Sequence, residues 1–388
     1  MVRATPASRQ PVHVKGRSMP LKSLLREPLL KFKPYVAGKP IEEVRREYGL
    51  EGRIAKLASN ENPLGTSPLA LAAMRKAIEE VYLYPDDNAY YYRKKVAERY
   101  DVEIENVFAA SGSVEVLELA GIAFIDPGDV ILASEKTFAI YALVAQKFAA
   151  TLRLSKMTDG GYRYDLKAMA ELLDDKVKIV FLANPTNPTG TWFTKSEFDA
   201  FMAKVPEHTL VVYDSAYEEY TTTPDMPDPM AHYRAGRRIM LLRTFSKAVG
   251  LAGIRAGYAV GPADIIHGLM TCRFPFNINL VAQAAAMAAM DDREFIEKSR
   301  EFNARELAFL REGLKGLPVT TPPSQTNFLF IDTQKDAQWL FAELQKIGVI
   351  VRPIGQKAIR VNTGLREDNE KFLVHFKRLI ESDGGRLP

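Results

Sequence analysis

The residues best suited to chemistry stand in short segments that follow one another along the chain, at 184–190 (NPTNPTG), 214–217 (DSAY) and 243–248 (RTFSKA). Lys247 could attack an aldehyde once its amine is neutral, a state favoured by burial or by neighbouring cations. Asp214 could keep a pyridine nitrogen protonated, which preserves the ring as an electron sink. Asn187 and Tyr217 could both bond the hydroxyl of such a ring. Together these side chains predict a site for pyridoxal 5'-phosphate (PLP), with Lys247 as the catalytic residue.

The phosphate of PLP is a dianion and needs oriented hydrogen-bond donors, which a second set of residues could supply. Gly112 and Ser113 stand at the start of an expected helix, where backbone amides and the positive end of the helix dipole bind anions. Ser246 adds a hydroxyl, and Arg255 adds a guanidinium that can bond two oxygens at once. The residues that we assign to this part of the cofactor site are Gly112, Ser113, Val114, Thr244, Ser246 and Arg255.

Each of these residues also has an ordinary structural explanation when it is taken alone. Most lysines lie on the surface, and an aspartate often ends a strand in an α/β protein. Asn-Pro pairs usually mark turns, and Gly-Ser often caps a helix. The number of segments and their order along the chain favour the cofactor site over these separate explanations.

Length, charge and cysteine usage set broad limits on the class of protein. The chain has 388 residues, enough for a large core and for two domains, and its net charge of +4 gives no argument for binding to nucleic acid or membrane. The single cysteine, Cys272, excludes an internal disulfide and fits a reducing compartment, so we expect a cytoplasmic protein. No apolar run reaches the ~18 residues of a membrane helix, and no metal site is expected.

Short apolar strands alternate with helical patterns over the central part of the chain. The strands are expected at 106–110, 130–133, 179–183, 210–213, 239–242 and 257–260. Apolar strands separated by helices are typical of a mainly parallel sheet covered on both faces, which predicts an α/β domain. Ligands bind beyond the carboxyl ends of such strands, so the segments at 112–113, 184–190 and 214–217 should converge on one crevice.

Beyond about residue 280 the pattern changes to an α+β layout. Long helices run to about residue 315 and are followed by a strand at 327–331, a helix near 335–346, strands at 349–352 and 358–362, and a closing helix. We therefore expect an arm at 1–19, a small domain formed by 20–62 and 281–388, and a large PLP-binding domain at 63–280.

The chain resembles the fold-type I PLP-dependent aminotransferases (class I/II), and within them the histidinol-phosphate aminotransferase family, from about residue 34 to its end. Besides the segments above, the motifs that carry the resemblance are Pro34-Tyr35, 58–65 (ASNENPLG), Tyr84-Pro85, 274–277 (FPFN), Val351-Arg352 and Arg360-Val361. The resemblance implies a large domain around a seven-stranded, mostly parallel sheet, a small domain built from both termini, and a homodimer with shared active sites.

The same resemblance implies roles for residues that the residue types alone do not assign. Phe138 would stack on the cofactor ring, and Tyr84 would reach the cofactor phosphate of the neighbouring subunit. The residues implied to bind the substrate anion are Arg360, Tyr35, Asn60 and Arg352. For the arginines the alternative is an exposed position on a strand, and for the tyrosines it is half-buried packing.

The implied reaction is transamination from histidinol phosphate to 2-oxoglutarate, giving imidazole acetol phosphate and glutamate in histidine biosynthesis. One arginine fork suits both the substrate phosphate and the carboxylates of the acceptor. The alternatives are an aromatic amino-acid aminotransferase, a threonine-phosphate decarboxylase and a non-catalytic regulatory relative. The sequence departs from the family pattern at Val114, at Ser215 and at Asn362-Thr363-Gly364, and the last of these adjoins the expected substrate anion.

Overall fold

The structure is a computed structural model that describes residues 24–31, 38–385 and 387. The expected arm at 1–19 and the substrate-site candidate Tyr35 lie outside the described residues. In the part that is described, no helix is both long and apolar enough to cross a membrane, and no group of three or more His, Cys, Asp or Glu side chains is placed to hold a metal ion.

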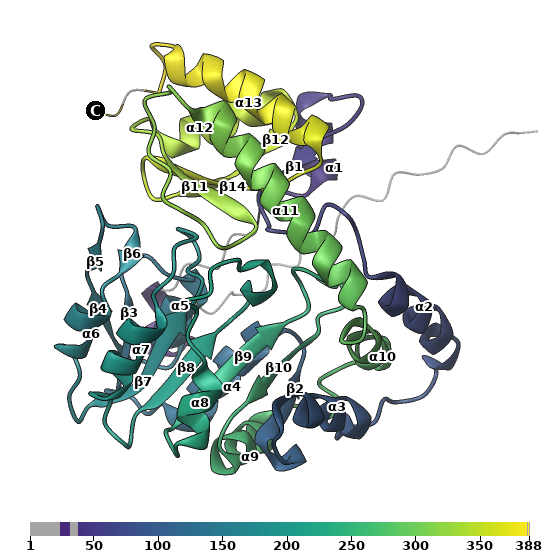
Figure 1. The fold of residues 1–388 in the computed structure, drawn as a ribbon, viewed down its shortest axis with the longest axis vertical. Helices are drawn as coiled ribbons and strands as arrows, with labels where there is room; N and C mark the ends of the chain where they lie inside the picture. Colours follow the sequence, from purple (N-terminus) through teal and green to yellow (C-terminus); the bar gives the residue numbers. More distant parts are fainter. Residues whose placement is uncertain (1–23, 32–37, 386, 388) are drawn as a thin grey trace, which may run out of the picture.

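A seven-stranded sheet forms the centre of the larger part of the molecule (Figure 1). Its strands, in spatial order, are β2 (Val107–Ala110), β10 (Gly257–Val260), β9 (Ile239–Thr244), β8 (Leu210–Asp214), β7 (Val177–Ala183), β3 (Val130–Ser134) and β4 (Thr151–Ser155). Strand β10 is antiparallel to both of its neighbours, and the other strands share one direction. The expected α/β architecture with a mostly parallel sheet is confirmed.

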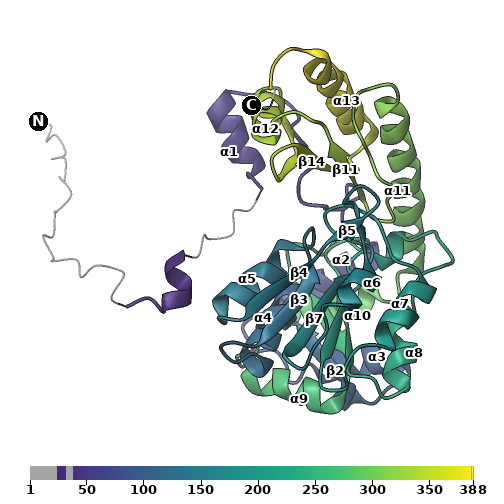
Figure 2. The same ribbon diagram turned by 90° about the vertical axis from the view of Figure 1, so that its left-hand side faces the viewer.

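Helices cover both faces of this sheet (Figure 2). One face carries α3 (Tyr90–Tyr100), α6 (Leu166–Ala170), α7 (Lys195–Met202), α8 (Pro229–Arg234) and α10 (Leu280–Ala289), and the other carries α4 (Ser113–Phe124), α5 (Ala139–Lys147) and α9 (Ala263–Cys272). Successive residues of β3 point to opposite faces. Leu132 packs under the helices of the first face, whereas Ile131 and Ala133 pack under α4, α5 and α9. Burial on both faces explains why the central strands are continuously apolar.

A smaller unit stands at one end of the large sheet and has its own core. It contains the antiparallel sheet β11 (Phe328–Asp332), β14 (Ala358–Asn362) and β13 (Arg352–Ile354), the parallel pair β1 (Ala55–Lys56) and β12 (Val349–Ile350), and the helices α1 (Ile41–Tyr48), α12 (Ala337–Lys346) and α13 (Arg366–Glu381). Because β1 pairs with β12, the N-terminal segment and the C-terminal third share this core. The domain limits 20–62, 63–280 and 281–388 stay a prediction.

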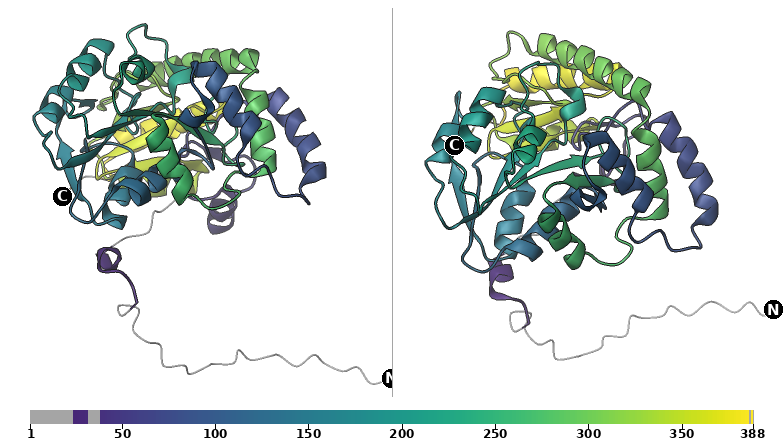
Figure 3. Two further views of the ribbon diagram at one scale, coloured as in Figure 1. Left: turned by 90° about the horizontal axis from the view of Figure 1, so that it is seen from below. Right: turned by 60° about the horizontal axis from the view of Figure 1, so that its bottom comes forward.

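Two features connect the units. The long helix α11 (Arg293–Leu314) runs from the large part of the molecule into the small one (Figure 1). Near its start, α2 (Pro68–Ala77) lies beside α10 (Figure 3). A short hairpin, β5 (Met157–Thr158) and β6 (Arg163–Tyr164), lies on the large unit and reaches toward the small unit, where the Tyr162 phenol donates to Asp332 Oδ2 at 2.9 Å.

Candidate active site

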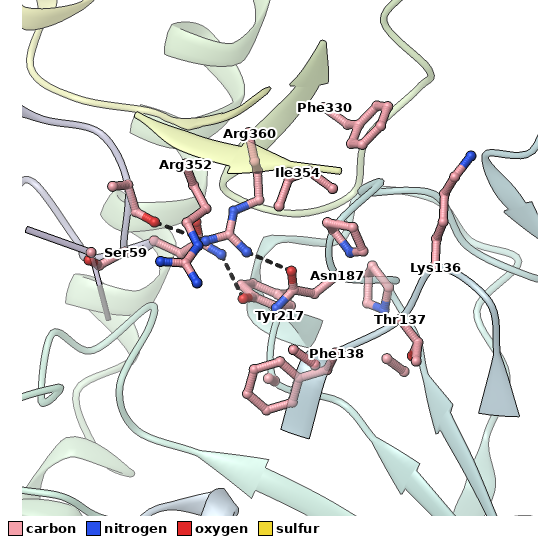
Figure 4. A pocket seen from close by; sticks show the side chains of 18 of the residues that line it. Ser59, Lys136, Thr137, Phe138, Asn187, Tyr217, Phe330, Arg352, Ile354 and Arg360 are labelled. Atoms are coloured by element: carbon pink, nitrogen blue, oxygen red, sulfur yellow. Dashed lines mark hydrogen bonds between the residues drawn. The ribbon is translucent and has the colours of Figure 1, made fainter. Parts of the chain in front are cut away.

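A cavity of about 860 Å³ opens between the carboxyl ends of the large sheet's strands and the small antiparallel sheet (Figure 4). Its walls come from the loops that follow β2, β3, β7, β8 and β9, from β13 and β14, and from the segment 58–61. The predicted site residues that line it are Asn60, Ser113, Val114, Phe138, Asn187, Asp214, Tyr217, Thr244, Ser246, Lys247, Arg255, Arg352 and Arg360. The structure therefore gathers segments that are far apart in sequence around one space.

Lys247 follows β9 and brings its amine into this cavity. The Nζ atom donates a hydrogen bond to the backbone oxygen of Ser59 at 3.3 Å and lies 5.8 Å from the centroid of the Tyr217 ring. Burial, followed by repulsion from the Arg360 guanidinium, lowers the pKa of Lys247 to about 8. A lysine in this state is a much better nucleophile at neutral pH than an ordinary surface lysine.

Asp214 ends β8 and is 5 % exposed. Its Oδ2 accepts a hydrogen bond from the Tyr141 phenol at 3.0 Å, and its Oδ1 accepts one from the backbone amide of Ala216 at 3.2 Å. Burial raises the pKa of the Asp214 carboxyl to about 6, although both hydrogen bonds act in the opposite direction. A protonated pyridine nitrogen beside this carboxylate would favour its charged form and complete an ion pair.

Two arginines from the small sheet face the large sheet across the cavity. Arg352 on β13 and Arg360 on β14 are direct partners in the strand register. Arg360 donates from Nη1 to Asn187 Oδ1 at 2.6 Å and from Nη2 to the backbone oxygen of Ala58 at 2.9 Å. Asn187 itself lies in the loop after β7, so its hydrogen bond with Arg360 joins the two units at the site (Figure 4).

Tyr217 and Asn60 form a buried pair beside Lys247. Asn60 donates from Nδ2 to the Tyr217 hydroxyl at 2.8 Å, and both residues are almost fully buried. The Tyr217 ring packs edge-on against Phe328 of β11, which fixes its plane. The phenol is therefore held in one orientation at the edge of the cavity.

A cradle of hydrogen-bond donors lies where α4 begins. Gly112 has a φ of 76°, and a Cβ atom placed there would lie 2.4 Å from Arg255 Nη2. Arg255 donates from Nη1 to the Ser246 hydroxyl at 3.4 Å, and Ser246 is joined in turn to the Thr244 hydroxyl at 3.0 Å. Guanidinium, hydroxyls and the first amides of α4, beginning at Ser113, make a donor set that suits a phosphate dianion.

Other predicted residues stand in different surroundings. Phe138 precedes α5 and presents its ring to the cavity (Figure 4). Tyr84 does not line the cavity; it is 81 % exposed and stacks on Phe276 at 4.5 Å between ring centroids. Gly112 lies behind Arg255 and is absent from the cavity wall.

Three contacts at the site, made by Tyr141, Ala58 and Ser59, were not predicted from the sequence. Tyr141, the hydrogen-bond donor to Asp214, lies one helical turn after Phe138 on α5, and this i,i+3 spacing was the available signal. The backbone oxygens of Ala58 and Ser59 hold Arg360 and Lys247. A backbone acceptor has no residue-type signature, so no sequence pattern could have identified these two.

The fold and this combination of amine, carboxylate and phosphate cradle define a class, the PLP-dependent enzymes of fold type I. The donor set fits the cofactor at each of its polar groups, and the space left by Gly112 for Arg255 is one that a side chain would close. PLP is accordingly the cofactor that the site is built to take.

Comparison with known proteins narrows this class. Residues 53–376 match the model of the family described as aminotransferase class I and II. The histidinol-phosphate aminotransferase of Moorella thermoacetica is 41% identical over 387 residues, which is 98% of this chain and 100% of that protein. The enzyme of the same name from Anaeromyxobacter sp. is 46% identical over 355 residues, covering 89% of this chain and 96% of that protein.

Solved aminotransferase structures have the same fold as this chain. The histidinol-phosphate aminotransferase from Sinorhizobium meliloti, in complex with pyridoxal-5'-phosphate, superposes with a TM-score of 0.83 at 25% identity, over 92% of this chain and 97% of that one. An aspartate aminotransferase mutant from Thermus thermophilus, with a TM-score of 0.80 at 21% identity over 92% of this chain and 99% of that one, shares the fold. The chain belongs to the class I and II aminotransferases and, within them, to the histidinol-phosphate aminotransferase family.

Proposed function

We propose that this protein transfers the amino group of histidinol phosphate to 2-oxoglutarate, producing imidazole acetol phosphate and glutamate in histidine biosynthesis. The observation that carries the proposal is the pair Arg352 and Arg360 on adjoining strands, with both side chains lining the cavity that holds Lys247. Relatives of the same name, 41% and 46% identical over most of the chain, support it.

The large unit would hold the cofactor. When bound, PLP supplies an aldehyde that condenses with amines and a ring that withdraws electrons from the substrate carbon. Asp214 would pair with the ring nitrogen, whereas Asn187 and Tyr217 would bond the ring oxygen. The remaining proposed contacts are Phe138 against the ring face and Gly112, Ser113, Val114, Thr244, Ser246 and Arg255 around the phosphate.

Lys247 would act twice in each half-reaction. Its neutral amine would hold the cofactor through the aldehyde carbon, and when not bonded to the cofactor the same amine would be free to carry a proton. With a pKa of about 8, the amine can both accept and release a proton near neutral pH. The hydrogen bond to the Ser59 oxygen keeps Nζ at the inner wall of the cavity while it does so.

The two arginines would bind the anionic ends of both substrates in turn. Arg360 is oriented by Asn187 and by the Ala58 backbone, so its guanidinium plane is fixed before substrate arrives. Arg352 adds a second positive charge on the neighbouring strand, which favours a phosphate dianion over a single carboxylate. Asn60, and Tyr35 from outside the described residues, would complete the anion site.

A cluster of exposed apolar side chains supports a dimeric assembly. Tyr84 belongs to a group of exposed apolar side chains that cluster in the segments 78–91 and 274–276: Ile78, Val81, Tyr82, Leu83, Tyr84, Tyr90, Tyr91, Phe274 and Phe276. Apolar patches of this kind mark protein interfaces. We therefore propose a homodimer in which Tyr84 contacts the cofactor phosphate bound by the partner; the single cysteine supports a cytoplasmic location.

Single half-reactions test the proposal against its rivals. The protein is loaded with PLP and mixed with one amine at a time without acceptor, and the loss of visible cofactor absorbance is followed. Histidinol phosphate should react with a kcat/KM at least about 100-fold above those of phenylalanine and tyrosine. The reason is that a substrate without the phosphate leaves the polar groups built to bind it unpaired. Preference for the aromatic amino acids, release of carbon dioxide from threonine phosphate, or failure to take up PLP would each overturn it.

A further inference from the structure

A line of buried amide side chains joins the end of β14 to the phenol of Tyr217. Asn362, the last residue of β14, is 2 % exposed, and its Oδ1 accepts a hydrogen bond from the backbone amide of Asn60 at 3.0 Å. Asn60 in turn donates from its side-chain Nδ2 to the Tyr217 hydroxyl at 2.8 Å. A residue of the small sheet is thus linked to a cofactor-site tyrosine of the large unit through one intermediary.

Asn60 occupies a backbone conformation that needs support. Its φ is 56°, in the left-handed region that asparagine tolerates better than most residues but still adopts at some cost. Both of its backbone polar groups are held by amide side chains, the N–H by Asn362 and the carbonyl by Asn327 Nδ2 at 3.1 Å. The left-handed conformation therefore depends on the side chain of Asn362, at the end of β14, and on that of Asn327, directly before β11.

This conformation matters because the neighbouring residues serve the same site. The backbone oxygen of Ala58 binds Arg360 and that of Ser59 binds Lys247, so the segment 58–60 contacts three functional side chains in succession. A change in the Asn60 backbone would alter the direction of its amide group relative to Tyr217. The phenol would then lose the contact that fixes its oxygen.

The chemistry of the Asn60 contact favours donation by Tyr217. An amide N–H can only donate, so in this contact the phenol oxygen is the acceptor and its proton goes to a different partner. Hydrogen bonds in series polarise one another, which makes the phenol a stronger donor. The acceptor that the proposed function places in the cavity beside Tyr217 is the ring oxygen of PLP.

We infer that Asn362 is a positioning residue: it holds Asn60 in the left-handed conformation from which the Asn60 amide orients Tyr217 toward the cofactor. The inference rests on the proposed function, and it gives Asn60 a role separate from contact with the substrate anion. It also gives a function to Asn362, the position where the sequence departs from the family pattern beside the substrate-binding Arg360.

The test is a pH titration of the visible absorbance of the PLP-loaded protein, for wild type, Asn362→Ala, Asn60→Ala and Tyr217→Phe. A hydrogen bond to the ring oxygen stabilises the anionic form of that oxygen. It therefore lowers the pKa at which the visible absorbance of bound PLP changes, here called the chromophore pKa. All three variants should therefore raise that pKa, Asn362→Ala and Asn60→Ala by about half a unit to one unit, the value of one net hydrogen bond. Thermal unfolding is measured on the same samples.

Asn303→Ala is the matched control. Asn303 is 3 % exposed and also makes two hydrogen bonds, to Thr326 and Thr363, but has none to Asn60. It should lose stability with an unchanged chromophore pKa. An unchanged pKa in Asn362→Ala, or an equal shift in Asn303→Ala, would overturn the inference. Should Asn362→Ala not fold, Asn60→Ala decides, since an unchanged pKa there removes the link to Tyr217.

Failure of this inference is separable from failure of the proposed function. A wild-type protein that binds PLP and transaminates histidinol phosphate, with variants that leave the chromophore pKa unmoved, would contradict only the role of Asn362. A wild-type protein that does not bind PLP would contradict both.

Discussion

The Tyr141 phenol donates a hydrogen bond to Asp214 Oδ2 at 3.0 Å; Tyr141 is fully buried, and Asp214 lines the cavity. Burial raises the pKa of Tyr141 well above its ordinary value, so the phenol stays protonated and can donate to the carboxylate. The carboxylate that would pair with the cofactor nitrogen is thus stabilised from behind by a neutral group.

Replacing this donor should change the pH dependence of PLP binding. In Tyr141→Phe the Asp214 pKa, about 6 in the structure, should rise because a hydrogen bond to the charged form is lost. In the protein without cofactor the ionised form is then present only at higher pH, so the pH below which PLP binding weakens should move upward by about one unit or more, measured by PLP titrations across a pH series. Tyr258→Phe is the control, because its buried phenol bonds Tyr100 and not Asp214. Equal pH dependence of PLP binding for Tyr141→Phe and wild type would contradict this role.

The lowered pKa of Lys247 predicts how fast the protein without cofactor captures PLP. With a pKa of about 8, roughly a quarter of the amine is neutral at about pH 7.5, against about 0.1 % for an unperturbed lysine. The capture rate should therefore rise with pH to a plateau with a midpoint near 8, measured by rapid mixing. In Arg360→Gln the midpoint should move to higher pH, since a neighbouring cation is removed. A midpoint near 10 in the wild type would show that the amine is not perturbed.

The two arginines should differ in their effect on the two substrates. Arg360→Gln removes the oriented fork that both anions share, so kcat/KM should fall by about 100-fold or more for histidinol phosphate and for 2-oxoglutarate. Arg352→Gln should lower kcat/KM several-fold more for histidinol phosphate than for 2-oxoglutarate. The reason is that a phosphate group, with two charges at one site, depends more on the second arginine than a single carboxylate does. Steady-state kinetics with each substrate varied in turn would measure this. Equal losses for both substrates in Arg352→Gln would contradict the assignment of Arg352 to the phosphate.

The cradle behind the phosphate site can be probed with one methyl group. In Gly112→Ala the new Cβ would lie 2.4 Å from Arg255 Nη2 at a φ of 76°, so Arg255 must move. The dissociation constant of PLP should rise at least about tenfold, the equivalent of one displaced charge-assisted hydrogen bond. Gly128→Ala is the matched control, since Gly128 has a φ of 99° but nothing lies within 4 Å of its Cβ position. If both variants bind PLP alike, backbone strain and not collision accounts for any effect.

Much of the fold could be read from the sequence because burial on both faces leaves a continuous apolar signal. Strands β7, β8 and β9 were expected to within two residues at each end. The edge strand β4 was not expected, since three of its five residues are polar and only Ser155 is buried. An edge strand has one neighbour and less cover, so its composition need not be apolar.

The candidate site likewise contains residues that the sequence could predict and residues that it could not. Lys247 and Asp214 could be named because their chemistry demands those residue types, whereas Arg360 was assigned through the resemblance to the family. Asn362 could not, because it acts through another residue, and a buried asparagine has many possible partners until the fold selects one. For Tyr141 the spacing from Phe138 was the one available signal, and it does not show that the phenol bonds Asp214.

The most direct measurement is reduction of the PLP-loaded protein with borohydride, followed by peptide mapping. Reduction makes the bond between the cofactor and its lysine permanent, so the expected result is one phosphopyridoxyl group per chain, on the peptide that contains Lys247. The Lys247→Ala variant should take up no label under the same conditions. A label on a different lysine, or an unlabelled wild-type protein that still transaminates, would contradict the central claim.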